Sequence, residues 1–271
     1  MESHYTSDDG LGGRLIEALE RAGLDLNNLT PRNLAPLDQL HTRGWPATVE
    51  RAEQFGFAPD MHVLDVGCGI GGPARYIADR FGCRVTGVDL TAEYVRAAKI
   101  LTAQMGLSDK VEFKCADALA LPLDDQSVDA VWSQNVSMNI SDSRALYREF
   151  HRVLKPGGRV FMTEMAQGPG GALHFPVPWA REPEISFLRT PDEMRENIEA
   201  SGLEIVGFND DSDIVIEWSK RQALRPKPRE APILTPIPVF GDDFPERARN
   251  SNRNLIERRA LNIQVTGRRN I

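Results

Sequence analysis

Cysteine is scarce in this chain of 271 residues, which contains only Cys68, Cys83 and Cys115. Their number is odd and their spacing differs from the paired spacing of zinc sites, so they predict neither a disulfide framework nor a bound metal. We interpret all three as buried, reduced thiols, the state in which cytoplasmic proteins keep cysteine. The scarcity of cysteine therefore predicts a cytoplasmic protein.

Long apolar runs and an excess of positive charge are also missing. No run approaches the ~18 apolar residues that a membrane-spanning helix needs. The first ten residues are polar and acidic, which is not the pattern of a signal peptide. Against 39 acidic residues there are 32 basic ones, which leaves a net charge of −7. Because an acidic chain gains little from a polyanion, we expect no nucleic-acid partner. Because no apolar run is long enough, we expect no membrane span.

What the sequence does contain is an alternation of apolar strands with helical segments. This alternation predicts an α/β fold, a parallel sheet with helices on both faces. We expect an N-terminal helical cap segment over 1–56 and one domain over 57–271. A stretch rich in Gly, Pro and aromatic residues at 166–190 predicts a lid, because loops of that length are usually functional. Strands are predicted at 62–66, 84–90, 111–117, 128–134 and 159–165, and helices at 72–82, 91–106 and 142–158.

The strongest motif is the glycine-rich turn Asp65-Val-Gly67-Cys68-Gly69-Ile-Gly71-Gly72, which joins a predicted strand to a predicted helix. Glycines let the backbone approach a ligand closely, and a helix N-terminus offers free N–H groups to an anion. The spacing of Gly67, Gly69 and Gly72 matches G-x-G-x-x-G, so an NAD site is one interpretation. The carboxylate of a methionine group is the other anion that this turn could hold.

Acidic residues lie at the ends of three successive predicted strands and bear on this choice. Asp65 precedes the first glycine by two residues, where it suits a cationic amino group and is ill placed beside a pyrophosphate. Asp89 follows Gly67 by 22 residues, where an acid suits a ribose diol in both interpretations. Asp117 can accept a hydrogen bond from an adenine amino group, with the Ala118 N–H facing the ring. The pattern favours an adenosylated amino acid over NAD.

These acids and the glycine turn, followed by SVDAVWSQN (127–135) and LKPGGRV (154–160), resemble class I S-adenosylmethionine-dependent methyltransferases over roughly residues 35–210. DVGCGIGGPARY and LPLDDQSVDAVWSQN are similar to the cluster of sarcosine/dimethylglycine, tocopherol and sterol methyltransferases. The resemblance implies a Rossmann-like seven-stranded sheet of order 3-2-1-4-5-7-6 with an antiparallel last strand. It also implies S-adenosylmethionine as cofactor, S-adenosylhomocysteine as product and a small-molecule acceptor. The implied cofactor contacts are Gln39, Thr42, Gly44, Asp65, Gly67, Cys68, Gly69, Asp89, Leu90, Asp117, Ala118, Leu119, Gln134 and Met138.

Three side chains are candidates for catalytic roles. His41 has the residue type whose ordinary pKa of ~6.5 suits a general base, although it could equally hold the fold by hydrogen bonds. Glu164 lies at the end of the fifth predicted strand, and His174 lies in the predicted lid. Relatives often carry a histidine between residues 133 and 139, where this chain has Asn135 and Asn139, and asparagine cannot act as a base.

Several alternatives stay open at the level of sequence. The methylated atom is N, O or C. An NAD-dependent oxidoreductase and a non-methylating enzyme that keeps the cofactor as a structural element are alternative functions. The last predicted helix carries Phe244, Leu255 and Ile256, which could serve a homodimer or the lid.

Overall fold

The computed structural model describes residues 10–224 and 234–271. Within these ranges the chain forms two compact units. The first contains residues up to Asp117 and a returning segment that ends at Asp242, and the second contains the rest. The strands are hydrogen-bonded in the order β3-β2-β1-β4-β5-β7-β6, which confirms the predicted order. Over residues 10–224 and 234–271, we find no helix with the length and hydropathy of a membrane span.

The first unit is built on three parallel strands, β1 (His62–Val66), β2 (Arg84–Asp89) and β3 (Val111–Cys115). Val63, Val85 and Val111 lie side by side in the register and are buried, as expected where helices cover a parallel sheet. The helices α4 (Gly72–Phe81) and α5 (Ala92–Gln104) pack on β2 and β3. α4 ends at Gly82, whose φ of 79° provides a left-handed helix cap.

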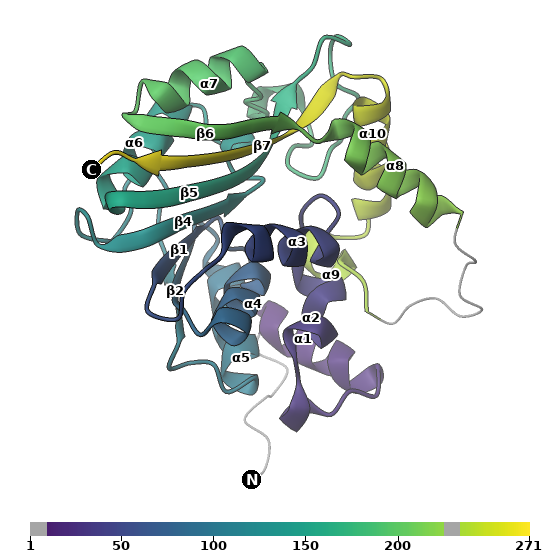
Figure 1. Ribbon diagram of the computed structural model, residues 1–271. Helices are drawn as coiled ribbons and strands as arrows, with labels where there is room; N and C mark the ends of the chain where they lie inside the picture. The colour runs from purple at the N-terminus through teal and green to yellow at the C-terminus, as the bar shows by residue number, and fades with distance from the viewer. Residues whose placement is uncertain (1–9, 225–233) are drawn as a thin grey trace. The chain divides into compact units, whose positions relative to one another are not determined.

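The N-terminal helices belong to this first unit. They are α1 (Gly10–Arg21), α2 (Pro31–Asp38) and α3 (Trp45–Phe55), with the 3-10 turn η1 (Leu26–Asn28). Figure 1 shows α1 and α2 beside α4 and α5. Leucines of α1 and α2 form a buried cluster with Ala97 and Leu101 of α5, and the returning helix α9 (Ile237–Phe240) adds Val239 to it. Apolar burial therefore anchors the N-terminal segment in this unit.

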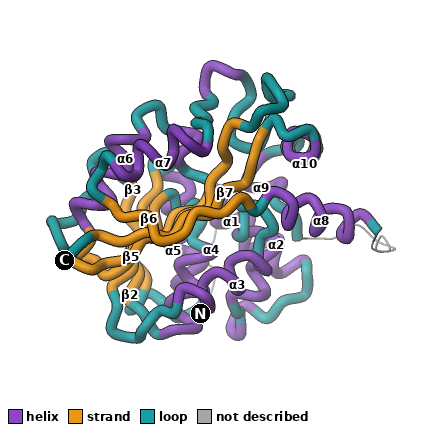
Figure 2. Tube along the Cα trace, turned by 45° about the horizontal axis from the view of Figure 1, so that its top comes forward, coloured by secondary structure: helices purple, strands orange, loops and turns teal. Residues whose placement is uncertain are grey.

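The second unit contains β4 (Val128–Gln134), β5 (Leu154–Gln167), β6 (Leu203–Asp210) and β7 (Ala260–Arg269). β4 is parallel to β5, and β7 is antiparallel to both β5 and β6, which confirms the predicted antiparallel last strand. Figure 2 shows β5, β6 and β7 side by side in orange. α6 (Ser143–Val153) packs beside α7 (Pro191–Glu199), and α8 (Ser212–Ala223) packs beside α10 (Phe244–Ile256) (Figure 1).

Among the predicted elements that are shorter in the structure, the helix before β5 differs most. The helix predicted over 142–158 ends at Val153, because Leu154 is already extended, with φ −68° and ψ 136°, and pairs with Val128. Pro156 has no N–H and disfavours helical backbone in the residue before it, so the helix ends ahead of the LKPGG sequence. That sequence opens β5, and the register between β4 and β5 shifts between Val128 and Ala130.

The loop between β5 and α7, predicted as a lid, is held by side chains of α10. Asn254 Nδ2 donates to the His174 carbonyl at 3.0 Å, and Asn250 Nδ2 donates to the Pro176 carbonyl at 2.9 Å. Arg247 donates to the Pro178 carbonyl at 3.3 Å. Side chains about one helical turn apart thus meet the carbonyl groups of alternate residues in the loop. The loop also contains the 3-10 turn η3 (Pro183–Ile185), and its function as a lid stays a prediction.

Candidate functional site

The glycine turn leaves β1 and enters α4 through backbone conformations that favour glycine. Gly67, Gly69 and Gly71 have φ values of 67°, 54° and 85°. A Cβ atom added to Gly69 would have no described atom within 4 Å, so the turn borders open space there. A Cβ atom added to Gly72 would instead collide with the backbone oxygen of Asp38. The turn therefore needs glycine for conformation at Gly69 and for close packing at Gly72.

Asp65 is a buried acidic residue, and only part of the hydrogen-bonding capacity of its side chain is used. Its exposed fraction is 2%, and it accepts a hydrogen bond from the Ala74 backbone. Its Oδ2 atom is buried without a partner among the described residues. Burial, followed by repulsion from Asp89, raises the pKa of Asp65 to about 8. Buried polar atoms are nearly always hydrogen-bonded, so this oxygen fits a donor or cation supplied by a ligand.

Asp89 holds the glycine turn from the end of β2. Its Oδ2 accepts from the Gly69 N–H at 2.9 Å, and its Oδ1 accepts from the Thr91 N–H at 2.8 Å. The next residue, Leu90, is a large apolar side chain that is 73% exposed. β3 ends at Cys115, so the exposed Asp117 lies two residues beyond the strand rather than at its end, as had been predicted. The last hydrogen bond between the two strands joins the Ala116 N–H to the Asp89 carbonyl at 3.1 Å.

Cys68 lies inside the turn as a packing residue. Like Cys83 it is buried, whereas Cys115 is exposed, so the prediction of three buried thiols was wrong for Cys115. The Cys68 side chain is 5% exposed, and a Cβ atom at Gly87 would lie 2.9 Å from its Sγ. Burial raises the pKa of the Cys68 thiol well above its ordinary value, so the reactive thiolate is disfavoured.

Residues 39–44 carry His41, which is half-buried, in a polar network with the buried side chains of Gln39 and Thr48. His41 Nε2 lies 2.8 Å from Thr48 Oγ1 and 3.1 Å from Gln39 Oε1, and Nδ1 lies 3.2 Å from the Thr42 carbonyl oxygen. Burial lowers the pKa of His41 to about 4, so the ring is neutral at pH 7. These contacts support the alternative that His41 holds the segment in place, and its role as a base stays a prediction. Gly44, with φ 54°, is the N-cap residue of α3.

A buried ion pair next to this segment was not predicted from the sequence. Arg75 of α4 donates to Asp38 Oδ2 at 2.8 Å, and both side chains are at most 1% exposed. Arg75 also donates to the Ala98 carbonyl at 3.3 Å and to Thr102 Oγ1 at 3.2 Å. The pair joins the end of α2, one residue before Gln39, to the first turn of α4. The signal in the sequence was an arginine in the otherwise apolar run Pro73–Ala78.

In the second unit, Glu164 of β5 is fully buried and faces the residues that follow β4. Its Oε2 accepts from the N–H groups of Val136 and Ser137 and from Ser137 Oγ, each at 2.9 Å. Ser133 Oγ donates to Oε1 at 3.3 Å. Burial raises the pKa of Glu164 to about 7, against the opposing effect of these donors.

The remaining predicted contacts also lie in the second unit. Gln134 is half-buried, and its Oε1 accepts from Trp132 Nε1 at 2.8 Å. Met138 is buried in a cluster with Met165 and Leu255. Ala118 and Leu119 are half-buried and begin this unit. Their predicted roles in cofactor binding stay predictions.

His174 lies in an ion cluster on the loop. Its backbone N–H donates to Asn254 Oδ1 at 2.8 Å, and its Nε2 lies 2.8 Å from Glu257 Oε2. Arg253, Arg259 and His174 together lower the pKa of Glu257 to about 2. These contacts anchor the loop to the end of α10, and a catalytic role for His174 stays a prediction.

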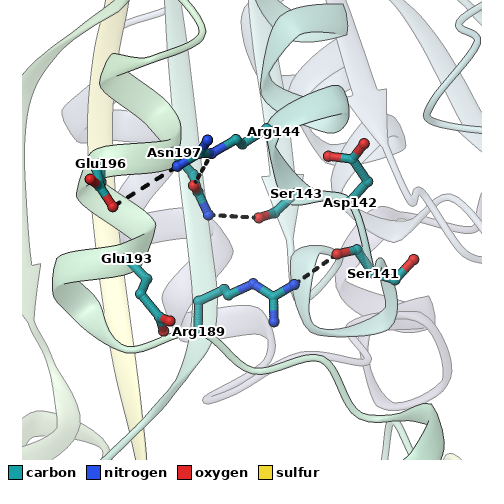
Figure 3. Close-up of a pocket in the computed structure, with 8 residues that line it drawn as sticks. All are labelled: Ser141, Asp142, Ser143, Arg144, Arg189, Glu193, Glu196 and Asn197. Atoms are coloured by element: carbon teal, nitrogen blue, oxygen red, sulfur yellow. Dashed lines mark hydrogen bonds and ion pairs between the residues drawn. The ribbon is translucent and has the colours of Figure 1, made fainter.

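A polar cavity of about 270 Å³ lies between α6 and α7 (Figure 3). Its groups are largely paired with one another: Arg144 donates to Asn197 Oδ1 at 2.6 Å, Asn197 donates to Ser143 Oγ at 3.0 Å, and Arg189 donates to the Ser141 carbonyl at 2.7 Å. Within the described part of the chain, the residues that line this cavity include none of the predicted site residues. We interpret it as a polar surface groove.

Comparison with known proteins identifies the domain. Residues 64–162 match the family model described as "Methyltransferase domain". Phosphoethanolamine N-methyltransferase 1 of Arabidopsis thaliana is 39% identical over 128 residues, which are 47% of this chain and 26% of that enzyme. The aligned regions span 25% to 46% of the length of the curated relatives.

Two solved structures share the fold. The [4+2]-cyclase SpnF is 26% identical, with a TM-score of 0.65, over 83% of this chain and 81% of that one. Geranyl diphosphate C-methyltransferase from Streptomyces coelicolor, solved with Mg²⁺, geranyl diphosphate and S-adenosylhomocysteine, is 21% identical with a TM-score of 0.65, over 84% and 80% of the two chains. With the strand order, these findings show that the chain has the Rossmann-like fold of these structures and that residues 64–162 match a methyltransferase domain.

Proposed function

We propose that this protein binds S-adenosylmethionine and transfers its methyl group to an N, O or C atom of a small molecule. The observation that carries the proposal is the unpartnered Asp65 Oδ2 atom, buried where β1 enters a glycine turn with a left-handed Gly69. The anion site of a helix N-terminus and a carboxylate lie together there, and they match the carboxylate and ammonium of an amino acid. A pyrophosphate would place its charge beside Asp65, which disfavours NAD.

S-Adenosylmethionine supplies an electrophilic methyl group on a sulfonium. In this proposal, Asp65 pairs with the amino group of the ligand, and Asp89 receives the ribose hydroxyls. Asp117 and the Ala118 N–H bind the adenine, and the exposed Leu90 packs against it. The buried Gln39 side chain carries an amide donor, which in this proposal serves the ligand carboxylate.

The acceptor side requires positioning above all. Holding the acceptor in line with the methyl group can provide roughly 7–11 kcal/mol of the barrier, so a strong general base is not essential. We assign acceptor recognition to the residues after β4 and to the loop 166–190 as a lid. Residues 1–56 act as the cap and 57–271 as the catalytic domain. A cytoplasmic location and a homodimer through α10 stay predictions from the sequence.

A second candidate function has one specific observation in its favour. SpnF, the neighbour at 26% identity, is described as a [4+2]-cyclase. A chain of this fold could therefore keep the cofactor as a structural element and catalyse another reaction. Consumption of S-adenosylmethionine separates the two functions, because only methyl transfer turns it over.

Calorimetric titration with S-adenosylmethionine, S-adenosylhomocysteine and NAD tests the proposal, with Asp89→Ala as the variant. We expect both adenosyl ligands to bind, NAD not to bind, and Asp89→Ala to lose binding. Methyl transfer is then measured with radiolabelled S-adenosylmethionine on a panel of phosphoethanolamine, sarcosine and geranyl diphosphate. Binding of NAD alone would refute the proposal, and adenosyl binding without turnover across a widening acceptor panel would favour the second function.

A further inference from the structure

Asn135 has an unusual backbone conformation for its residue type. It follows β4 directly and has a φ of 59°, in the left-handed region that residues other than glycine seldom adopt. Val136 returns to right-handed backbone, with φ −111° and ψ −49°. Consecutive residues of opposite hand turn successive N–H groups toward one point and form an anion-binding concavity called a nest.

The anion in this nest is the carboxylate of Glu164. The N–H groups of Val136 and Ser137 converge on Oε2 at 2.9 Å, and Ser137 Oγ reaches the same atom at 2.9 Å. These three residues of the second unit are buried. The hydrogen bonds to this buried carboxylate come from the protein itself, so its acceptor capacity is already used. This argues against a role as the base that takes a proton from the acceptor.

The side chain of Asn135, next to the nest, lacks a hydrogen-bond partner for one of its atoms among the described residues. The backbone of Asn135 is satisfied, since its N–H donates to the Thr163 carbonyl at 2.8 Å and Asn139 Nδ2 donates to its carbonyl at 3.4 Å. Its Oδ1 atom, however, is buried and has no partner in the part of the chain that is described. Strained backbone and an orphaned polar atom coincide at the carboxyl end of a strand, where α/β sheets bind ligands.

We propose that Glu164 is a positioning residue, which fills the Val136–Ser137 nest, holds Asn135 in its left-handed conformation and thereby presents the Asn135 amide oxygen to an N–H or O–H donor of the methyl acceptor. The role of Glu164 in the nest is independent of the reaction, whereas the role of Asn135 rests on the proposed methyl transfer. The acceptor is accordingly a molecule with a hydrogen-bond donor near the methylated atom.

The nest is tested without any ligand, by measuring amide hydrogen exchange of Val136 and Ser137 by NMR. Glu164→Leu removes all acceptors, and we expect exchange to be roughly tenfold to hundredfold faster. In Glu164→Gln the amide oxygen can accept the same three donors and its NH2 can donate to Ser133, so exchange stays close to that of the wild type. Slow exchange in the leucine variant, or equally fast exchange in both variants, overturns the assignment.

The role in catalysis is tested on the panel acceptor that the wild-type protein methylates. Glu164→Gln should keep its kcat, whereas loss of a general base would lower it by about 10²–10⁴-fold. Asn135→Gly keeps the left-handed backbone without the amide, and it should raise the acceptor KM at least about tenfold with the Kd of S-adenosylhomocysteine unchanged.

The matched control is Gln126→Gly, which replaces another non-glycine residue of positive φ, 55°, in an exposed turn. It should change neither KM nor kcat. An unchanged KM in Asn135→Gly refutes the role of Asn135. A wild-type protein that fails to bind S-adenosylhomocysteine counts against the proposed function alone, because the exchange experiment decides the nest without it.

Discussion

Replacing Asp65 with asparagine is expected to stabilise the ligand-free protein while removing its affinity for S-adenosylhomocysteine. The pKa of Asp65 is raised from 3.8 to about 8 by burial and by Asp89. The folded protein therefore keeps a proton that the unfolded chain releases, and stability is lost progressively as the pH rises from about 4 to 8. Asparagine carries no charge in either state, so this loss disappears in the variant.

The magnitude follows from the separation between the working pH and the unfolded pKa. At pH 7.5 the unfolded carboxylate lies about 3.7 pH units above its pKa, and each unit corresponds to 1.36 kcal/mol. The upper bound on the gain is thus about 5 kcal/mol, and we expect between about 1 and 5 kcal/mol because the site can relax. For a chain of this size each kcal/mol raises Tm by roughly 2–4 °C.

The affinity for the ligand should change with pH in the direction opposite to the stability, and it should rise as the pH rises. An ammonium group pairs with the ionised form of Asp65, and the ionised fraction rises from about 1% at pH 6 to about 24% at pH 7.5 for a pKa of about 8. The affinity for S-adenosylhomocysteine should therefore rise roughly 25-fold over that interval. Asp65→Asn should bind at least about a hundredfold more weakly at pH 7.5, because it cannot offer the charge.

Thermal unfolding and calorimetric titration between pH 5 and 8 measure both effects. Asp60→Asn is the control, since Asp60 is an exposed aspartate in the same unit. It should alter neither Tm nor binding. An Asp65→Asn protein that is less stable than the wild type at pH 7.5, or a wild-type affinity that does not change with pH, would refute the reasoning from burial.

Three further predictions concern other contacts. Gly69→Ala should weaken S-adenosylhomocysteine binding in calorimetry and lower stability by about 1–2 kcal/mol, because alanine is strained at φ 54°; unchanged binding would contradict it. Arg75→Met should cost about 3–5 kcal/mol in urea unfolding by leaving Asp38 buried and unpaired, and adding Asp38→Leu should recover most of that loss; a double variant no more stable than the single one would contradict it. Asn254→Ala should make the loop near His174 more sensitive to limited proteolysis, because two hydrogen bonds at 2.8 and 3.0 Å are lost; an unchanged cleavage pattern would show that the loop is held elsewhere.

The sequence was sufficient wherever the chemistry is local. The spacing of the glycines at 67, 69 and 72 predicts a tight turn between a strand and a helix from only a few residues of sequence. The turn lies where it was expected. The alternation of strands and helices predicted the α/β class in the same way. The strand order came from resemblance to a family, because local patterns do not specify which strands pair.

Contacts between distant residues depended on the tertiary structure. Asp38 and Arg75 are 37 residues apart, and the arginine in the apolar run Pro73–Ala78 gave no indication of which acidic residue pairs with it. The chain direction after β4 brings the N–H groups of Val136 and Ser137 to Glu164, and no local pattern indicated these donors. His174 was considered as a catalytic residue, and α10 holds it by contacts spanning more than 80 residues.

Sequence alone therefore determined the fold class, the glycine turn and the acidic residues near the strand ends. Their conformational preferences and charges act over a few residues, which a linear pattern records. The tertiary structure alone decided which polar groups are satisfied and which remain without a partner, as at Asp65 and Asn135. The physical reason is that burial and hydrogen bonding are properties of an environment assembled from distant parts of the chain.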